Sequence, residues 1–157
     1  MPAAANGDAS GLRLAPDPEN PGWLNWQFAY AEEHRFNREV MGKMLLRRDD
    51  DTHARLRLFP VERHLNPMGN IHGGIIMSLI DICLFTTWRL LSNTDIGGTV
   101  TLELSNQFVG PGVLDQPLDA IGEIVRETGR MVFVRGQVEQ EHGIVASFSG
   151  IIRKTGQ

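Results

Sequence analysis

The apolar and polar positions of this 157-residue chain predict one long buried helix that is followed by several strands. The helix corresponds to an almost continuous apolar run, from Ile75 to Leu91. Asp81 and Arg89 interrupt this run, whereas a membrane span needs about 20 mostly apolar residues. We therefore expect a helix that is buried inside a domain, and we expect no membrane association.

Strands are predicted on both sides of this helix, because apolar and polar residues alternate there with a period of two. Turn-forming residues, among them Gly129 and Gly143, separate the later strands. A helix followed by strands with short connections predicts an α+β fold, with an antiparallel sheet packed on the helix. The expected strands are 53–58, 100–108, 118–126, 131–140 and 144–153.

The N-terminal third has a different pattern. Residues 1–22 show no period and are rich in Ala, Pro, Gly, Asp and Asn, so we expect an extended or disordered lead. From Trp23 to Leu46, apolar residues recur at spacings of three and four, which predicts an amphipathic helix. We interpret this helix, assigned to 23–47, as packed on a main domain that spans 48–157.

Composition and charge narrow the classes of function. The net charge of −4 argues against non-specific nucleic-acid binding, which requires a basic face. The single cysteine, Cys83, excludes an intrachain disulfide framework and is typical of a reducing compartment. No signal peptide pattern is found at the N-terminus, and we expect a cytoplasmic protein. Cys83 is interpreted as a buried core residue, and a nucleophilic role is the less favoured alternative.

Candidate chemistry lies on and before the long helix. Asp81 is its only carboxylate, and such a group in an apolar setting is paired, hydrogen-bonded, protonated or functional. Backbone N–H groups of Gly73 and Gly74, at the helix N-terminus, can point at a carbonyl oxygen. With Asn66 to hydrogen-bond a water or the carbonyl, these are parts for acyl-transfer hydrolysis. On residue types alone, the alternative that Asp81 caps or bridges neighbouring elements stays open.

His72 stands beside the glycine pair, where a general base or a metal ligand is conceivable. No His or Cys partner lies nearby at the spacing of a metal site, so we expect no metal. Our default interpretation is a structural histidine that holds the loop by hydrogen bonds. The chain has no G-x-S-x-G, Walker or G-x-G-x-x-G motif.

The combination Asn66-x-x-Gly69-x-x-His72-Gly73-Gly74 followed by Leu79-Ile80-Asp81 resembles the active-site motif of a known family. This family is the hotdog-fold acyl-CoA thioesterases of the phenylacetic-acid-degradation type. The resemblance covers roughly residues 48–154. It implies a long central helix wrapped by a curved antiparallel sheet. It also implies homodimers with two active sites at the interface, which often pair into homotetramers.

The resemblance also implies roles for individual residues. Asp81 would be the general base or nucleophile, and the Gly73 N–H would polarise the thioester carbonyl. Asn66 would position the carbonyl or the water, helped by Thr101 or, if the alignment slips by one pleat, by Thr99. The remaining residues that we assign to substrate binding are His72, Gly74, Gly129 and Arg130, the last two in the turn that would touch CoA.

The expected reaction is hydrolysis of an acyl-CoA thioester with no metal and no organic cofactor. Apolar residues near the motif suggest an aromatic or medium-chain acyl group, although the N-terminal helix, which lies outside the motif, could cover the acyl pocket. Two alternatives stay open. One is a non-catalytic acyl-CoA-binding module, and the less favoured one is a hotdog hydratase or dehydratase, which needs a second catalytic His opposite the acid.

Overall fold

The computed structural model describes residues 12–28, 35–94 and 98–155 of the chain. These residues form eight strands, one long helix and two short helical turns. The turns are a π-helical turn, η1, and a 3₁₀ turn, η2. The elements in chain order are β1 (Leu12–Pro16), β2 (Leu24–Phe28), η1 (Asn37–Met41), β3 (Met44–Arg48), β4 (His53–Leu58), η2 (Glu62–His64), α1 (Gly73–Ser92), β5 (Thr99–Phe108), β6 (Leu118–Glu127), β7 (Met131–Gln140) and β8 (Gly143–Lys154).

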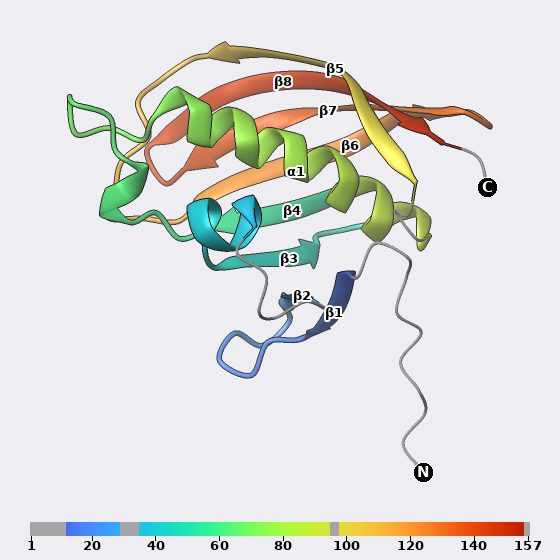
Figure 1. The fold of residues 1–157 in the computed structure, drawn as a ribbon, viewed down its shortest axis with the longest axis horizontal. Helices are drawn as coiled ribbons and strands as arrows, with labels where there is room; N and C mark the ends of the chain where they lie inside the picture. Colours follow the sequence, from blue (N-terminus) through green and yellow to red (C-terminus); the bar gives the residue numbers. More distant parts are fainter. Residues whose placement is uncertain (1–11, 29–34, 95–97, 156–157) are drawn as a thin grey trace.

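The strands make one curved sheet in which every pair of neighbours is antiparallel. The order across the sheet is β1-β2-β3-β4-β6-β7-β8-β5, so β5 is an edge strand. The helix α1 runs diagonally across one face of this sheet, as Figure 1 shows. The sheet curves around it, which is the arrangement that the sequence predicted.

The core lies between α1 and the sheet. Buried helix residues such as Leu79, Ile80 and Leu84 pack on alternate residues of the strands, for example Leu56 and Val134. By length and composition α1 could cross a membrane, but 56% of its apolar window is buried inside this fold. A buried core helix accounts for the apolar run, as expected from the charges that interrupt it.

Glycines let the helix lie close to the sheet. A Cβ at Gly150 would lie 2.5 Å from Leu84 Cδ1, and one at Gly122 would overlap the side chain of Thr87. Both strands therefore approach α1 more closely than a side chain at these positions would permit. The absence of a Cβ at Gly122 and at Gly150 therefore allows the close packing of α1 on the sheet.

The edge strand β5 departs from simple alternation. Its pairing with β8 shifts register between Thr101 and Glu103, so Leu102 forms a β-bulge. Thr101 pairs with Ile152 and Leu104 pairs with Gly150, on the face that α1 covers. Leu102, expected on the apolar face, is instead 51% exposed. The bulge therefore turns a threonine and a leucine toward the same side of the sheet.

The prediction of an N-terminal helix over residues 23–47 is wrong. The described residues between Trp23 and Leu46 form β2, η1 and the first part of β3, and residues 29–34 lie outside the described part of the chain. β2 pairs with β1 and with β3, so the sheet continues across the expected domain boundary at residue 48. Within the expected lead, 12–16 is a strand, and 1–11 falls outside the described residues.

Two arginines hold this N-terminal addition on the sheet. The guanidinium groups of Arg47 and Arg57 both lie over the ring of Trp23, 4.4 and 4.5 Å from its centroid. Asp119 on β6 then binds Arg57 through two hydrogen bonds of 2.8 and 2.7 Å. Trp23, which the apolar spacing placed in a helix, thus attaches the β1–β2 hairpin to the rest of the sheet.

Candidate active site

The central contact of the site joins the helix to the edge strand. The hydroxyl of Thr101 donates a hydrogen bond of 2.6 Å to Asp81 Oδ1. Asp81 lies on the side of α1 that faces β5, and its side chain is half-buried. Of the two threonines that the sequence left open, Thr101 therefore reaches the carboxylate. The hydrogen bond fixes one carboxylate oxygen and leaves the other available for a second partner.

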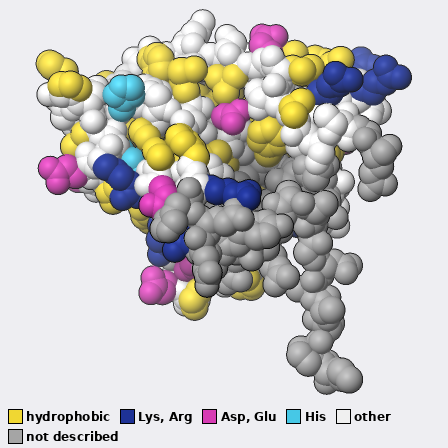
Figure 2. All heavy atoms as spheres, in the orientation of Figure 1, with side chains coloured by type: hydrophobic (Ala, Val, Ile, Leu, Met, Phe, Trp, Pro, Cys, Tyr) yellow, Lys and Arg dark blue, Asp and Glu magenta, His cyan; other side chains and the backbone are white. Residues whose placement is uncertain are grey.

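A pocket of about 250 Å³ opens at Asp81. Its lining is mostly apolar and comes from three separate parts of the chain: the start of η1, one face of α1 and the strand β5. Figure 2 looks onto the helix and shows hydrophobic side chains gathered on this face of the molecule. The lining residues are Phe36, Asn37, Met77, Ser78, Asp81, Ile82 and Leu104.

The start of α1 is organised by His72. Its backbone is extended, and its Nδ1 accepts a 2.8 Å hydrogen bond from the Gly74 N–H, so His72 is the N-cap of the helix. The Gly74 N–H is therefore already hydrogen-bonded within the chain. The Gly73 N–H has no hydrogen-bond partner among the described residues, and it remains the candidate donor for a ligand. Phe108 approaches Gly73 so closely that a Cβ there would lie 3.1 Å from its ring.

The loop before the helix is held by its own side chains. Asn66 Oδ1 accepts hydrogen bonds from the N–H groups of Met68 and Asn70, at 2.9 and 3.1 Å. The Asn66 N–H in turn bonds Asn70 O at 2.8 Å, and the His72 N–H bonds His64 O at 2.8 Å. Asn66 therefore shapes the loop that presents Gly73, and its amide oxygen is occupied in this task.

Gly129 and Arg130 lie at the other end of α1. The turn between β6 and β7 is closed by Thr128, whose Oγ1 accepts from Met131 N at 2.9 Å. Next to it, Glu127 accepts from Trp88 Nε1 at 2.9 Å, near the C-terminal end of the helix. Burial opposes ionisation of Glu127, but hydrogen bonds from Lys154, Trp88 and Ser92 lower its pKa. The turn thus lies far from Gly73 of the same chain.

The spacing of the candidate groups along α1 has a direct consequence. Asp81 follows Gly73 by eight residues, which is about 12 Å along a helix. One carbonyl group cannot contact both the Gly73 N–H and the Asp81 carboxylate of a single chain. Among the residues that the structure describes, no three His, Cys, Asp or Glu side chains are grouped to hold a metal ion.

Cys83 has no access to this pocket. It is fully buried, its Sγ lies 3.5 Å from Thr87 Oγ1 and 3.7 Å from Ala120 O, and burial raises the pKa of its thiol to about 12. A nucleophile must be a thiolate that substrate can reach. The structure therefore supports the interpretation of Cys83 as a core residue.

Asn106 is a polar residue of the site region that the sequence reasoning did not single out. It pairs with Phe148 in the stretch of β5 that contains Leu104 and Phe108. Its Nδ2 is buried and finds no hydrogen-bond partner in the described part of the chain. Buried amide donors are rarely left without a partner, which makes this group notable. The sequence did contain an indication of this residue, because Asn106 interrupts the apolar series Leu102, Leu104, Phe108.

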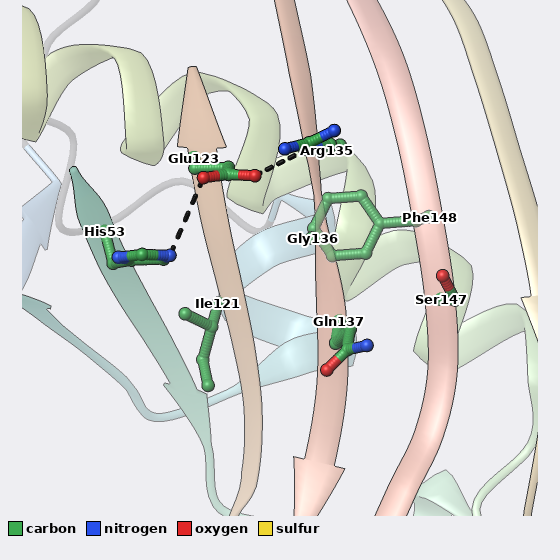
Figure 3. A pocket seen from close by; sticks show the side chains of 8 residues that line it. All are labelled: His53, Ile121, Glu123, Arg135, Gly136, Gln137, Ser147 and Phe148. Atoms are coloured by element: carbon green, nitrogen blue, oxygen red, sulfur yellow. Dashed lines mark hydrogen bonds and ion pairs between the residues drawn. The ribbon is translucent and has the colours of Figure 1, made fainter. Parts of the chain in front are cut away.

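A second pocket, of about 360 Å³, lies on the sheet face away from α1 (Figure 3). Its acid, Glu123, is paired with Arg135 on the neighbouring strand and lies 3.7 Å from His53 Nε2. Figure 3 shows these three side chains in one row across β4, β6 and β7. An acid that is already neutralised by an arginine is a poor base, so we do not place the chemistry here.

Comparison with models of known protein families assigns this chain to one of them. Residues 68–147, about half of the chain, match the family model of the thioesterase superfamily. None of the curated proteins matches the sequence. The matched region contains the start of α1, Asp81 and Thr101.

Solved structures show the same fold. The Escherichia coli PaaI protein from the phenylacetic acid degradation operon is 18% identical, with a TM-score of 0.65 over 78% of this chain and 86% of that chain. Mouse thioesterase superfamily member 2 is 17% identical, with a TM-score of 0.63 over 75% and 86%. A hypothetical thioesterase from Streptococcus pneumoniae with coenzyme A is 26% identical, with a TM-score of 0.60 over 71% and 85%. The expected hotdog fold is confirmed.

Proposed function

Because this chain belongs to the thioesterase superfamily, we propose that it hydrolyses an acyl-CoA thioester to a free acid and CoA. The observation that carries the proposal is the 2.6 Å hydrogen bond from Thr101 to Asp81 at the edge of an apolar pocket. A carboxylate held in this way at a pocket that accepts an acyl group has the position of a catalytic base. The coenzyme A in the S. pneumoniae neighbour supports CoA as the carrier.

In the proposed reaction, Asp81 acts on the thioester carbonyl carbon, either directly or through a water that it deprotonates. Thr101 holds Asp81 Oδ1, so the other carboxylate oxygen performs this step. The Gly73 N–H, at the positive end of the helix dipole, stabilises the negative charge that develops on the carbonyl oxygen. On the water route, the carbon–sulfur bond breaks and the CoA thiolate takes up the proton that Asp81 removed from the water. On the direct route, the CoA thiolate leaves an anhydride between the acyl group and Asp81, and water then hydrolyses this anhydride to the free acid, restores the carboxylate and supplies the proton of the thiol.

This assignment requires two chains. Asp81 and Gly73 are about 12 Å apart on one helix, so we propose that Gly73 of a second copy completes each site in a homodimer. The edge strand β5 supports this proposal, because no other strand of the described residues pairs with its outer side. Val100 near its start and Val109 just after its end are exposed. Further pairing of dimers into a homotetramer follows from the family resemblance alone.

The substrate class follows from the pocket. Its lining by Phe36, Met77, Ile82 and Leu104 suits an aromatic or medium-chain acyl group, as in the phenylacetic-acid-degradation type of thioesterase. We assign Arg130, exposed in the β6–β7 turn beside Gly129, to the CoA phosphates. His72 and Gly74 take a supporting role, since their mutual hydrogen bond shapes the helix start that presents Gly73.

The test is release of free thiol from short-chain, long-chain and aromatic acyl-CoAs. Asp81→Asn keeps the size of the side chain and an oxygen for Thr101, so the fold should persist while activity falls by several orders of magnitude. Asp115→Asn, which changes an exposed loop carboxylate, is the matched control and should retain activity. Undiminished turnover in Asp81→Asn would remove Asp81 as the catalytic group. Tight acyl-CoA binding without turnover by the wild type would replace the proposal with a binding module.

A further inference from the structure

We infer that the segment Phe36–Met41, from the N-terminal addition, forms a fixed wall of the acyl pocket and that Phe36 sets the greatest length of acyl group accepted. This inference rests on the proposed function and adds a specificity-determining residue to it. Phe36 and Asn37 come from outside the matched region of residues 68–147, yet they line the same pocket as Asp81.

Phe36 has an unusual environment for an aromatic residue. It is 52% exposed, and it immediately precedes a helical turn whose last residue, Met41, is fully buried. Across the pocket lie Met77 and Ile82 of α1 and Leu104 of β5. An acyl chain that extends from a thioester carbonyl at Asp81 would run between these apolar side chains and end at the ring. Burying the ring against such a chain removes apolar surface from water on both sides.

The wall is anchored at its other end. Met41 is fully buried in the core, and Val40 O accepts two hydrogen bonds, from His64 Nε2 at 2.7 Å and from Arg63 Nε at 3.1 Å. His64 Nδ1 accepts from the Val61 N–H at 3.0 Å, which places the ring proton on Nε2 as the donor to Val40. Residues far apart in the sequence thus hold the end of η1 in place.

The turn ends where a side chain would not fit. Gly42 has φ +77°, and a Cβ there would lie 2.6 Å from Arg63 Nη2. The Gly42 N–H donates to Asn37 O at 3.0 Å and closes the turn. Arg63 therefore covers Gly42 while it binds Val40 O.

The anchor is also continuous with the catalytic helix. His64, which holds Val40 through its side chain, accepts a 2.8 Å hydrogen bond from the His72 N–H through its backbone oxygen. His72 is the N-cap of α1. One histidine thus connects the end of the wall at Val40 to the start of the helix that carries Asp81, and both His64 and the adjacent Met41 are fully buried. A fixed wall selects by length, whereas a mobile lid would adapt to its substrate.

The test compares acyl-CoAs of increasing chain length with wild type, Phe36→Ala and Phe36→Trp. Each further methylene that the vacated space accommodates should add about fourfold to kcat/KM. Phe36→Ala should therefore favour chains two carbons longer by about sixteenfold relative to wild type, and Phe36→Trp should shift the optimum to shorter chains. Val125→Ala, which truncates a 55% exposed apolar residue on β6, should leave the chain-length profile unchanged.

Binding separates this inference from the proposed function. The same ligands are titrated calorimetrically into Asp81→Asn protein with and without the Phe36 substitutions. A shift of the binding profile with Phe36 supports the wall, and if the wild type hydrolyses none of these ligands, only the catalytic proposal is refuted. Hydrolysis or binding whose length profile is the same in all three Phe36 forms overturns the inference. Absence of any acyl-CoA binding by the wild type overturns both.

Discussion

Replacing Thr101 by Val removes one hydroxyl and keeps the shape of the side chain. The hydroxyl donates a 2.6 Å hydrogen bond to Asp81 Oδ1, and hydrogen bonds to charged groups contribute about 1.5–3 kcal/mol. Asp81 is only half-buried, so water can replace part of this contact and the lower end applies. A loss of about 1.5 kcal/mol corresponds to roughly a tenfold decrease in kcat. This decrease is much smaller than the one expected for Asp81→Asn, because the carboxylate itself remains.

The assay is steady-state thiol release with the preferred acyl-CoA, and urea unfolding monitors stability. Thr99→Val, two residues earlier on the same strand, is the matched control and should change kcat by less than about twofold. In the double variant Asp81→Asn/Thr101→Val, the second change should have no further effect, because Thr101 acts through the carboxylate. The reasoning fails if Thr101→Val is fully active, or if Thr99→Val is the impaired variant.

Two further predictions concern buried and paired groups. Because burial raises the pKa of Cys83 to about 12, iodoacetamide at pH 8 should leave the native protein unmodified and alkylate it fully in urea; rapid alkylation of the native form would contradict this burial. Burial raises the pKa of Asp49, but hydrogen bonds from Arg47 and Arg55, each 2.7 Å long, outweigh it and lower the pKa below 3.8. A lowered folded-state pKa adds stability above pH 3.8 that is lost as the pH falls through the folded value. Asp49→Asn should therefore be less stable than wild type at pH 7, with the difference in unfolding free energy shrinking toward pH 2; a difference independent of pH would refute it.

The long helix and the last four strands were predictable from the sequence because their patterns are long. The run from Ile75 to Leu91 became Gly73–Ser92, and strand 131–140 has the predicted bounds. Long patterns leave few alternatives, and the glycine-containing turns mark where each strand ends. The motif from Asn66 to Asp81 likewise indicated the site region, because it lies on one loop and one helix.

The short N-terminal elements were not predictable in the same way. Over five residues, apolar spacings of three and four occur in a strand–turn–strand segment as readily as in a helix. Trp23 and Met41 are both buried, but Trp23 makes cation–π contacts with two arginines and Met41 packs in the core. The strands formed because β1 pairs with β2, β2 with β3 and β3 with β4, and local periodicity does not record such pairing.

The position of Thr101 was predictable only in part. The sequence placed it among the polar residues of its strand, opposite Leu104 in the alternation. The β-bulge at Leu102 brings Thr101 and Leu104 to the same face. A bulge depends on how two strands pair, so the alternation of one strand could not reveal it. The same shift explains why the expected apolar residue Val100 is 46% exposed.

Gly122 and Gly150, on which α1 packs, couple the evolution of the core to that of the candidate active site. Asp81 lies less than one turn before Leu84, whose side chain rests on Gly150. A methyl group at Gly150 would lift the helix and move the carboxylate relative to Thr101, although no atom of Gly150 reaches the pocket. Such a methyl requires Leu84 to move, or to become smaller at the same time. Among descendants of this chain, residues 84 and 150 are therefore expected to change as a pair, so that drift in the core is constrained by the geometry of the active site.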